Sequence, residues 1–130
     1  MELIGVGIDL VDVARVERML DRHAERVLQR FLTAGEQAYV RATHRPAMHL
    51  AARIAAKEAA YKALQALPGA RGIGWQQLEV ERETEGRPSL KLLGLARELM
   101  LRHGPLRVEL SLSHSERTAG AVAVVVRDAS

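Results

Sequence analysis

The 130-residue sequence contains no cysteine, and aromatic residues make up only 3% of it. Without cysteine the chain has no disulfide framework, no thiolate metal site and no cysteine nucleophile, which fits a reducing compartment. No apolar run reaches the roughly 18 residues that a membrane-spanning helix needs, and the acidic N-terminus does not resemble a signal peptide. We therefore expect a cytoplasmic protein without membrane contacts.

What the sequence does contain is a large apolar fraction, 48% of the residues, with a formal net charge of +3. This apolar content argues against disorder, and the length suits one domain covering residues 1–130. The small positive excess indicates an anionic partner without saying which kind.

Hydrophobic periodicity predicts the order of the helices and strands. The expected helices cover residues 13–31, 34–39, 47–67 and 95–103. Thr33 and Glu36 form the capping box of the second helix, and Pro46 suits the first turn of the third. The expected strands cover residues 3–10, 76–83, 89–93, 107–114 and 120–127. Because the late strands follow one another as hairpins, we expect an α+β fold with a mostly antiparallel sheet.

The segment AARIAAKEAAYKAL, residues 51–64, is an alanine-rich helix that carries Arg53, Lys57, Glu58 and Lys62. The simplest interpretation is a solvent-exposed face with one ion pair, because Glu58 and Lys62 are four residues apart. The alternative is that these cations bind phosphate groups.

The first strand favours the alternative, because Asp9 shares a strand face with Gly5 and Gly7. Glycines in a strand allow close backbone approach, so this face could pack on the alanine helix and bring Asp9 near Glu58. Two such carboxylates need a cation or a proton between them, and Mg²⁺ accepts one or two carboxylates together with phosphate oxygens. Asp9 could instead merely end the strand and cap the next helix, although Asp12 is equally able to do so.

Five arginines of the first predicted helix are spaced three or four residues apart and lie on one side. Their mutual repulsion would be relieved by an acidic partner, although neighbouring acidic residues could also lower it on a solvated helix. These residues are Arg15, Arg18, Arg22, Arg26 and Arg30.

The segment SLSHSE, residues 111–116, places Ser113 and His114 at the end of a predicted strand. A hydrolytic Ser–His pair is a weak interpretation, because strand neighbours face opposite sides and the chain lacks the G-x-S-x-G nucleophile motif. A hydroxyl and an imidazole that bind phosphate fit better, although a histidine in a turn is often just a surface residue.

Taken together, three segments resemble the signature blocks of the holo-acyl-carrier-protein synthases, the short class of phosphopantetheinyl transferases. FLTAGEQAYV, residues 31–40, matches between the first two blocks, and Ile54 departs from the pattern where an aromatic residue is expected. The three blocks are GVGIDLVDVARVE at residues 5–17, ARIAAKEAAYKAL at 52–64 and SLSHSERTAGAVAVV at 111–125.

This resemblance implies that the chain transfers the 4′-phosphopantetheine arm of coenzyme A to a serine of apo acyl carrier protein, with release of adenosine 3′,5′-bisphosphate. It implies Mg²⁺ bound by Asp9 and Glu58, and Lys62 at the transferring phosphate. Glu58 is also our candidate for the base that takes the proton of the serine. The expected fold is a sheet wrapped around the long central helix.

The resemblance also implies where the two substrates bind. Gly86 and Pro88 would lie beside the adenine of coenzyme A, and His114 would contact one of its phosphates. Arg53, Lys57 and Ser113 are further residues expected to bind coenzyme A. The carrier protein would dock on Arg15, Arg18, Arg22 and Arg26. The family further implies a homotrimer, with each site in the cleft between two subunits.

A small basic nucleic-acid-binding domain that uses the helix from Arg15 to Arg30 is the rival hypothesis. The scarcity of aromatic residues speaks against it, because base stacking needs them. An enzyme should bind coenzyme A in a magnesium-dependent way, whereas the rival should bind nucleic acid with a steep salt dependence.

Overall fold

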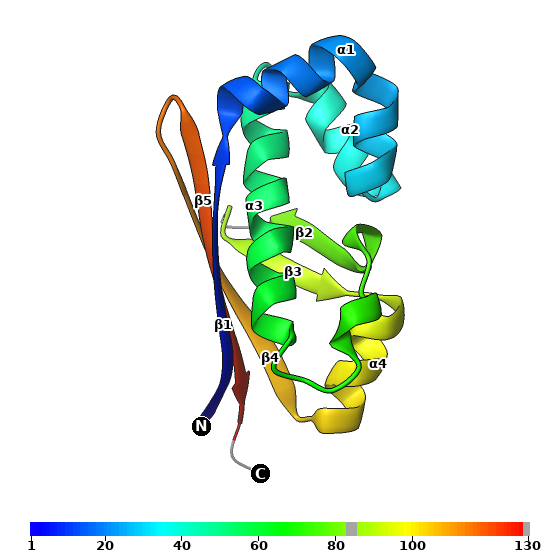
Figure 1. Cartoon of the computed structure of the whole chain (residues 1–130), viewed down its shortest axis with the longest axis vertical. Helices are drawn as coiled ribbons and strands as arrows, with labels where there is room; N and C mark the ends of the chain where they lie inside the picture. Colours follow the sequence, from blue (N-terminus) through cyan, green and yellow to red (C-terminus); the bar gives the residue numbers. More distant parts are fainter. Residues whose placement is uncertain (83–85, 129–130) are drawn as a thin grey trace.

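A computed structural model describes residues 1–82 and 86–128 of the chain. The long helix α3 (Pro46–Leu64) runs between one group of strands (β1, β4 and β5) and the other helices, as Figure 1 shows. The other elements are β1 (Glu2–Asp12), α1 (Val13–Phe31), α2 (Ala34–Ala42), η1 (Ala70–Gly72), η2 (Trp75–Gln77), β2 (Leu78–Arg82), β3 (Pro88–Leu92), α4 (Gly94–His103), β4 (Leu106–His114) and β5 (Thr118–Arg127).

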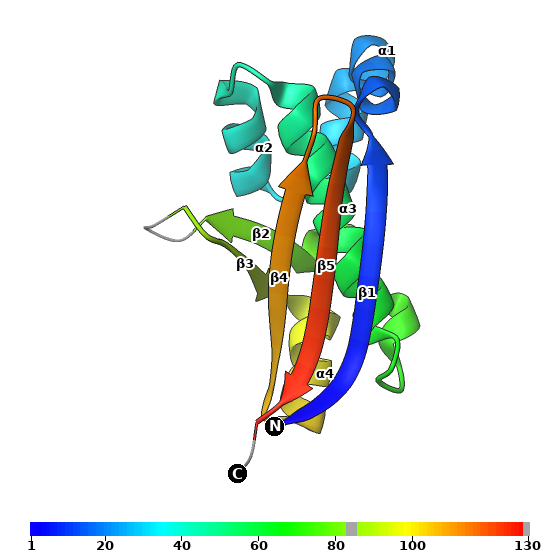
Figure 2. The same ribbon diagram turned by 90° about the vertical axis from the view of Figure 1, so that its left-hand side faces the viewer.

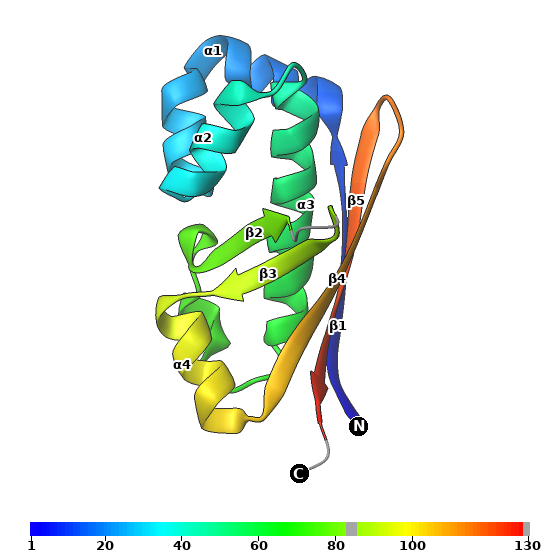
Figure 3. The ribbon, with the colours of Figure 1, turned by 180° about the vertical axis from the view of Figure 1, so that it is seen from behind.

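The strands form two antiparallel sheets on different sides of α3. One has three strands in the order β1-β5-β4, and the other is the β2–β3 hairpin. The three-stranded sheet covers one flank of α3, while the hairpin crosses α3 from behind (Figures 2 and 3). The expectation of an antiparallel α+β fold around a central helix is confirmed, but the expected single sheet is divided in two.

The contact between β1 and α3 explains the small residues of both elements. A Cβ atom added to Gly7 would lie 1.9 Å from the carbonyl oxygen of Ala59, and one added to Gly5 would lie 2.0 Å from that of Ala63. Only glycine therefore fits at either position, and the predicted packing of a glycine face on an alanine face is confirmed. The side chain of Asp9 is carried on this same helix-facing side of β1.

The opposite face of β1 is apolar and lies open. Val6, Ile8 and Leu10 are 55%, 60% and 71% exposed. We expected Ile4 on this face, but a register shift between Leu3 and Gly5 interrupts the alternation, and Ile4 packs against the core instead. The sheet therefore presents an apolar outer face that the described chain does not cover.

Helix α1 has the predicted boundaries but is not continuous. His23 has non-helical backbone angles (φ −147°, ψ 45°), and Figure 1 shows the helix bending within its length. The helical segment after His23 is held in place by two contacts. Arg41 forms an ion pair with Glu25, and the side chain of Gln76 donates to the carbonyl of Gln29. The predicted arginine stripe is consequently divided between two helical segments with different directions.

The helix α3 starts at Pro46, one residue before the predicted range, and it ends at Leu64, three residues earlier than expected. The backbone N–H of Gln65 is shared between the carbonyls of Tyr61 and Lys62, which closes the last turn. The nearby Pro68 favours extended backbone in the residue before it. Among the described residues, none of the helices combines the length and apolar character needed to cross a membrane.

Candidate active site

The two predicted metal-binding carboxylates line one pocket of about 420 Å³, which lies between β1, α1 and α3. Partial burial raises the pKa of Glu58 above its ordinary value, and the negative charge of Asp9 raises it further. The two carboxylates are therefore close enough to repel each other. Asp9 does not cap α1; the carboxylate of Asp12 does, accepting from the backbone N–H of Ala14 at 3.0 Å.

Lys62 faces this pair of carboxylates from α3. Its Nζ donates to Oδ1 of Asp9 at 3.1 Å and to the carbonyl oxygen of Ile8 at 2.9 Å. The ion pair considered between Lys62 and Glu58 is thus replaced by one between Lys62 and Asp9. The side chain of Lys62 remains half exposed, so its ammonium group can also contact an anion beside the two carboxylates.

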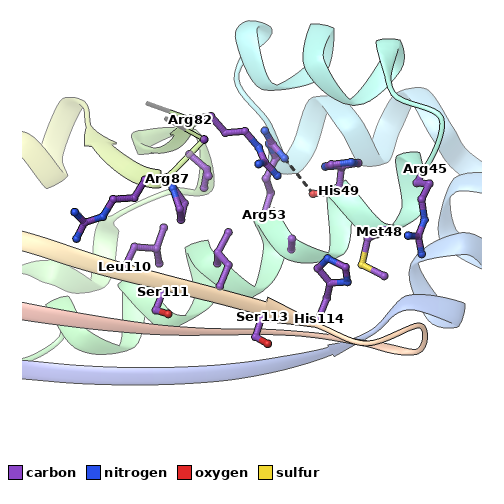
Figure 4. Close-up of a pocket in the computed structure, with 15 residues that line it drawn as sticks. Arg45, Met48, His49, Arg53, Arg82, Arg87, Leu110, Ser111, Ser113 and His114 are labelled. Carbon is purple, nitrogen blue, oxygen red and sulfur yellow. Dashed lines mark hydrogen bonds between the residues drawn. The ribbon is translucent and has the colours of Figure 1, made fainter. Parts of the chain in front are cut away.

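A second and larger pocket, of about 510 Å³, lies between the N-terminal half of α3, the hairpin β2–β3 and β4. Figure 4 shows side chains from these elements around it. The structure brings together here five residues predicted to bind coenzyme A, namely Arg53, Gly86, Pro88, Ser113 and His114.

The larger pocket is strongly cationic. Burial lowers the pKa of His49, and the nearby positive charges of Arg53, Arg82 and Arg45 lower it further. Such a concentration of positive charge favours a ligand with several phosphate groups. Sequence analysis missed the additional basic residues that line this pocket, which are Arg45, His49, Arg82 and Arg87.

The two pockets lie at opposite edges of the three-stranded sheet. The carboxylate pocket adjoins β1 and the cationic pocket adjoins β4, and these are its two outer strands. Figure 2 shows β4 and the hairpin on one side of the sheet and β1 on the other. The two pockets share none of their described lining residues.

Comparisons with known proteins show the family of the chain. Residues 5–124 match the family model of the 4′-phosphopantetheinyl transferase superfamily. The chain is 44% identical over 128 residues to the holo-[acyl-carrier-protein] synthase of Moorella thermoacetica, an alignment that covers 95% of this chain and 94% of that protein. It is also 44% identical over 126 residues to the enzyme of the same name from Anaeromyxobacter dehalogenans, covering 95% of each.

The chain belongs to the 4′-phosphopantetheinyl transferase superfamily.

Solved structures of this superfamily share the fold. The holo-(acyl-carrier-protein) synthase of Bacillus anthracis in complex with CoA (3′,5′-ADP) matches with a TM-score of 0.80 at 29% identity, covering 98% of this chain and all (100%) of that one. The Helicobacter pylori enzyme in complex with coenzyme A matches with a TM-score of 0.77 at 29% identity, covering 93% and 99%.

Lys57 requires a correction. It was expected to bind coenzyme A, but its side chain is fully buried (0% exposed). Its Nζ donates to the carboxylate of Glu36 at 2.7 Å and to the carbonyls of Trp75 and Leu78 at 2.8 and 2.7 Å. All three N–H groups of the ammonium are therefore used, and Lys57 has no donor left for a phosphate.

The arginines of α1 lie differently with respect to the carboxylate pocket. Arg15 lines it together with Asp9 and Glu58. Arg18 and Arg22 lie on the same exposed segment of α1, whereas Arg26 and Arg30 follow the interruption at His23. Arg15, Arg18 and Arg22 thus form a basic surface beside the carboxylate pocket. Arg26 and Arg30 belong to the second helical segment of α1.

Proposed function

We propose that this phosphopantetheinyl transferase moves the 4′-phosphopantetheine arm of coenzyme A to a serine of apo acyl carrier protein and releases adenosine 3′,5′-bisphosphate. The observation that carries this proposal is the pairing of a carboxylate pocket with a cationic pocket in a member of this superfamily. The first suits a metal ion and a reacting phosphate, and the second suits the phosphorylated nucleotide half of coenzyme A.

The carboxylate pocket fits Mg²⁺ by the chemistry of its donors. Asp9 and Glu58 offer hard oxygen ligands, and their mutual repulsion favours a cation between them. The described residues contain no cluster of three or more metal-ligating side chains, so water and substrate oxygens would complete the coordination. When bound, Mg²⁺ would neutralise negative charge on the pyrophosphate of coenzyme A.

Lys62 and Glu58 are assigned the chemical roles. The half-exposed ammonium of Lys62 would stabilise the charge that gathers on the transferring phosphate. The carboxylate of Glu58, directly or through a water molecule, would take the proton of the attacking serine. The arginines and histidines of the cationic pocket would hold the leaving bisphosphate in place.

The two halves of the site would come from neighbouring subunits of a homotrimer. A cyclic assembly that sets the β1 edge of one chain beside the β4 edge of the next would close each site. The apolar outer face of the sheet supports such an assembly, since exposed apolar patches commonly mark interfaces.

The arginines of the first α1 segment are proposed to receive the acidic carrier protein. Arg15 adjoins the two carboxylates, so a carrier bound along Arg18 and Arg22 would present its serine at the reacting phosphate. Arg26 stays a weaker candidate, because it lies beyond the interruption at His23. The proposed compartment is the cytoplasm, and the whole of residues 1–130 would act as one transferase domain.

The direct test compares Asp9→Asn and Glu58→Gln with the exposed control Asp21→Asn. With magnesium, coenzyme A and apo acyl carrier protein, both site variants should lose more than about a hundredfold in transfer, while keeping the wild-type thermal unfolding midpoint. Transfer is measured as the mass increase of the carrier protein. Activity of Asp9→Asn within a few-fold of wild type at limiting magnesium would contradict the assignment of Asp9 as a metal ligand.

A titration with DNA and RNA at several salt concentrations tests the rival hypothesis of a nucleic-acid-binding domain in parallel.

A further inference from the structure

A buried charge network lies directly behind the cationic pocket and has no role in the reaction described above. Its centre is Glu36 of α2, which is 2% exposed and does not line that pocket. Oε1 of Glu36 accepts from Nζ of Lys57 at 2.7 Å and from the backbone N–H of Thr33 at 3.0 Å. Oε2 accepts from the backbone N–H of Val80 at 3.0 Å.

The network reaches the pocket through Arg53. Nε of Arg53 lies 4.0 Å from Oε2 of Glu36, is buried, and makes no hydrogen bond among the described residues. Nη1 donates to the carbonyl oxygen of His49 at 3.4 Å, the dashed line in Figure 4, and the guanidinium lies 4.3 Å from the ring centre of Tyr39. The carboxylate, the carbonyl and the aromatic ring together fix the plane of this guanidinium.

Burial of the Arg53 guanidinium is energetically unfavourable. It is 4% exposed, and burial lowers its pKa while the charge of Glu36 opposes that change. Without a carboxylate behind it, the guanidinium would gain by turning towards solvent. Within residues 1–82 and 86–128, Nη2 makes no hydrogen bond to the protein, which leaves it as a donor for an anion in the pocket.

We infer that Glu36 is a positioning residue for coenzyme A binding: it holds the guanidinium of Arg53 in the wall of the cationic pocket, ready for a phosphate group. This inference rests on the proposed function of that pocket. Glu36 also neutralises the buried Lys57, which is a structural role. The experiment must therefore separate the two roles.

The separating variant is the double substitution Glu36→Gln with Lys57→Met. It removes the carboxylate from Arg53 without orphaning the ammonium group of Lys57, because the buried Glu36–Lys57 pair is replaced by neutral groups. We expect it to unfold within a few degrees of wild type and to bind coenzyme A about tenfold more weakly by calorimetry. Glu79→Gln is the matched control, since Glu79 accepts from the hydroxyl of Thr33 in the same network and should leave the Kd within twofold.

The dependence on Arg53 is tested by a double-mutant cycle. In an Arg53→Met background, the same double substitution should change the Kd for coenzyme A by less than twofold, because its target is gone. An equal, tenfold loss in both backgrounds would overturn the inference, and so would wild-type affinity of the double variant in the Arg53 background. If wild type itself fails to bind coenzyme A, the proposed function fails instead.

Glu36→Asp keeps the inference testable should the double variant not fold. It retains the charge beside Lys57, so the chain should remain folded, but it withdraws the carboxylate from Arg53 by one methylene. A Kd raised several-fold is expected. An unchanged Kd in the folded Glu36→Asp protein would show that Glu36 does not position Arg53.

Discussion

At the scale of single residues, Gly7 determines how closely β1 approaches α3. Replacing it by alanine puts a Cβ atom 1.9 Å from the carbonyl oxygen of Ala59, a backbone atom that a side-chain rotation cannot move. We expect Gly7→Ala to lower the free energy of unfolding by about 2–3 kcal/mol, measured by urea denaturation. Gly74→Ala is the control, because its Cβ meets nothing within 4 Å. Equal stabilities of the two variants would contradict this packing.

His49 gives a prediction for pH at the same scale. Burial and the surrounding cations lower its pKa from 6.5, so the unfolded chain takes up a proton at a higher pH than the folded chain. Stability should therefore fall as the pH is lowered from about 6.5 towards the lowered pKa. His49→Gln should remove this part of the pH dependence, whereas His44→Gln at an exposed site should not. Parallel curves of unfolding free energy against pH for wild type and His49→Gln, between pH 7.5 and roughly pH 5, would contradict a lowered pKa of His49.

At the scale of an element, the interruption of α1 decides which arginines can meet one partner. Arg18 and Arg22 are the best probes, since Arg15 also lines the carboxylate pocket. Arg18→Glu with Arg22→Glu should raise the KM for the carrier protein on the order of tenfold, and leave the KM for coenzyme A within twofold.

Two controls accompany the α1 experiment. Added salt should imitate the substitution, because it screens attraction between surface charges. Arg97→Glu on the exposed side of α4 reverses one arginine charge at a distant site and should leave both constants unchanged. A parallel rise of both constants in the α1 variant would mean that the helix supports the fold or the coenzyme A site.

At the scale of the whole molecule, the separation of the two pockets predicts complementation between inactive chains. A Glu58→Gln chain lacks the β1-side half of a site, and a His114→Ala chain is impaired in the β4-side half. In randomly mixed trimers, about one site in four combines two intact halves. Mixing the two variants through mild unfolding and refolding should thus restore roughly a quarter of wild-type activity. No recovery, despite mixed trimers seen by native mass spectrometry, would place both residues on one side of the site.

The open apolar face of the sheet gives a second prediction for the assembly. Sedimentation should show about three times the mass of one 14.3 kDa chain. Ile8→Lys, at a position that is 60% exposed in the single chain, should disrupt the trimer and abolish activity while the secondary structure seen by circular dichroism persists. A fully active monomer would exclude the shared site.

Several features could be predicted because they depend on neighbours in the chain. The sequence pattern located the four α-helices and the five strands of the described residues but neither 3-10 helix, and Thr33 with Glu36 forms the predicted capping box. The contact of Gly7 with Ala59 followed from the shortage of side-chain atoms on both elements. The helices, strands and capping box are local, so the order of residues is sufficient to determine them, whereas the contact of Gly7 with Ala59 joins distant residues and was expected only as a possibility.

Other features depend on residues that are distant in sequence. The sequence pattern places Lys57 as one more cation on an exposed helix face. In the fold its ammonium group instead donates to Glu36, Trp75 and Leu78. Arg45 and Arg82 lie 37 positions apart, and no spacing rule connects them until α3 and the hairpin meet at one pocket.

The sequence by itself determined the α-helices, the strands and the kinds of groups available for chemistry, and it offered the packing of β1 on α3 as a possibility. Only the tertiary structure decided that Lys57 is structural, that α1 is interrupted at His23 and that the two pockets lie at opposite sheet edges. The physical reason is that whether a charged side chain is buried or exposed depends on the groups that surround it and form hydrogen bonds or ion pairs with it. Those groups are assembled by folding and have no signature in the residues beside it.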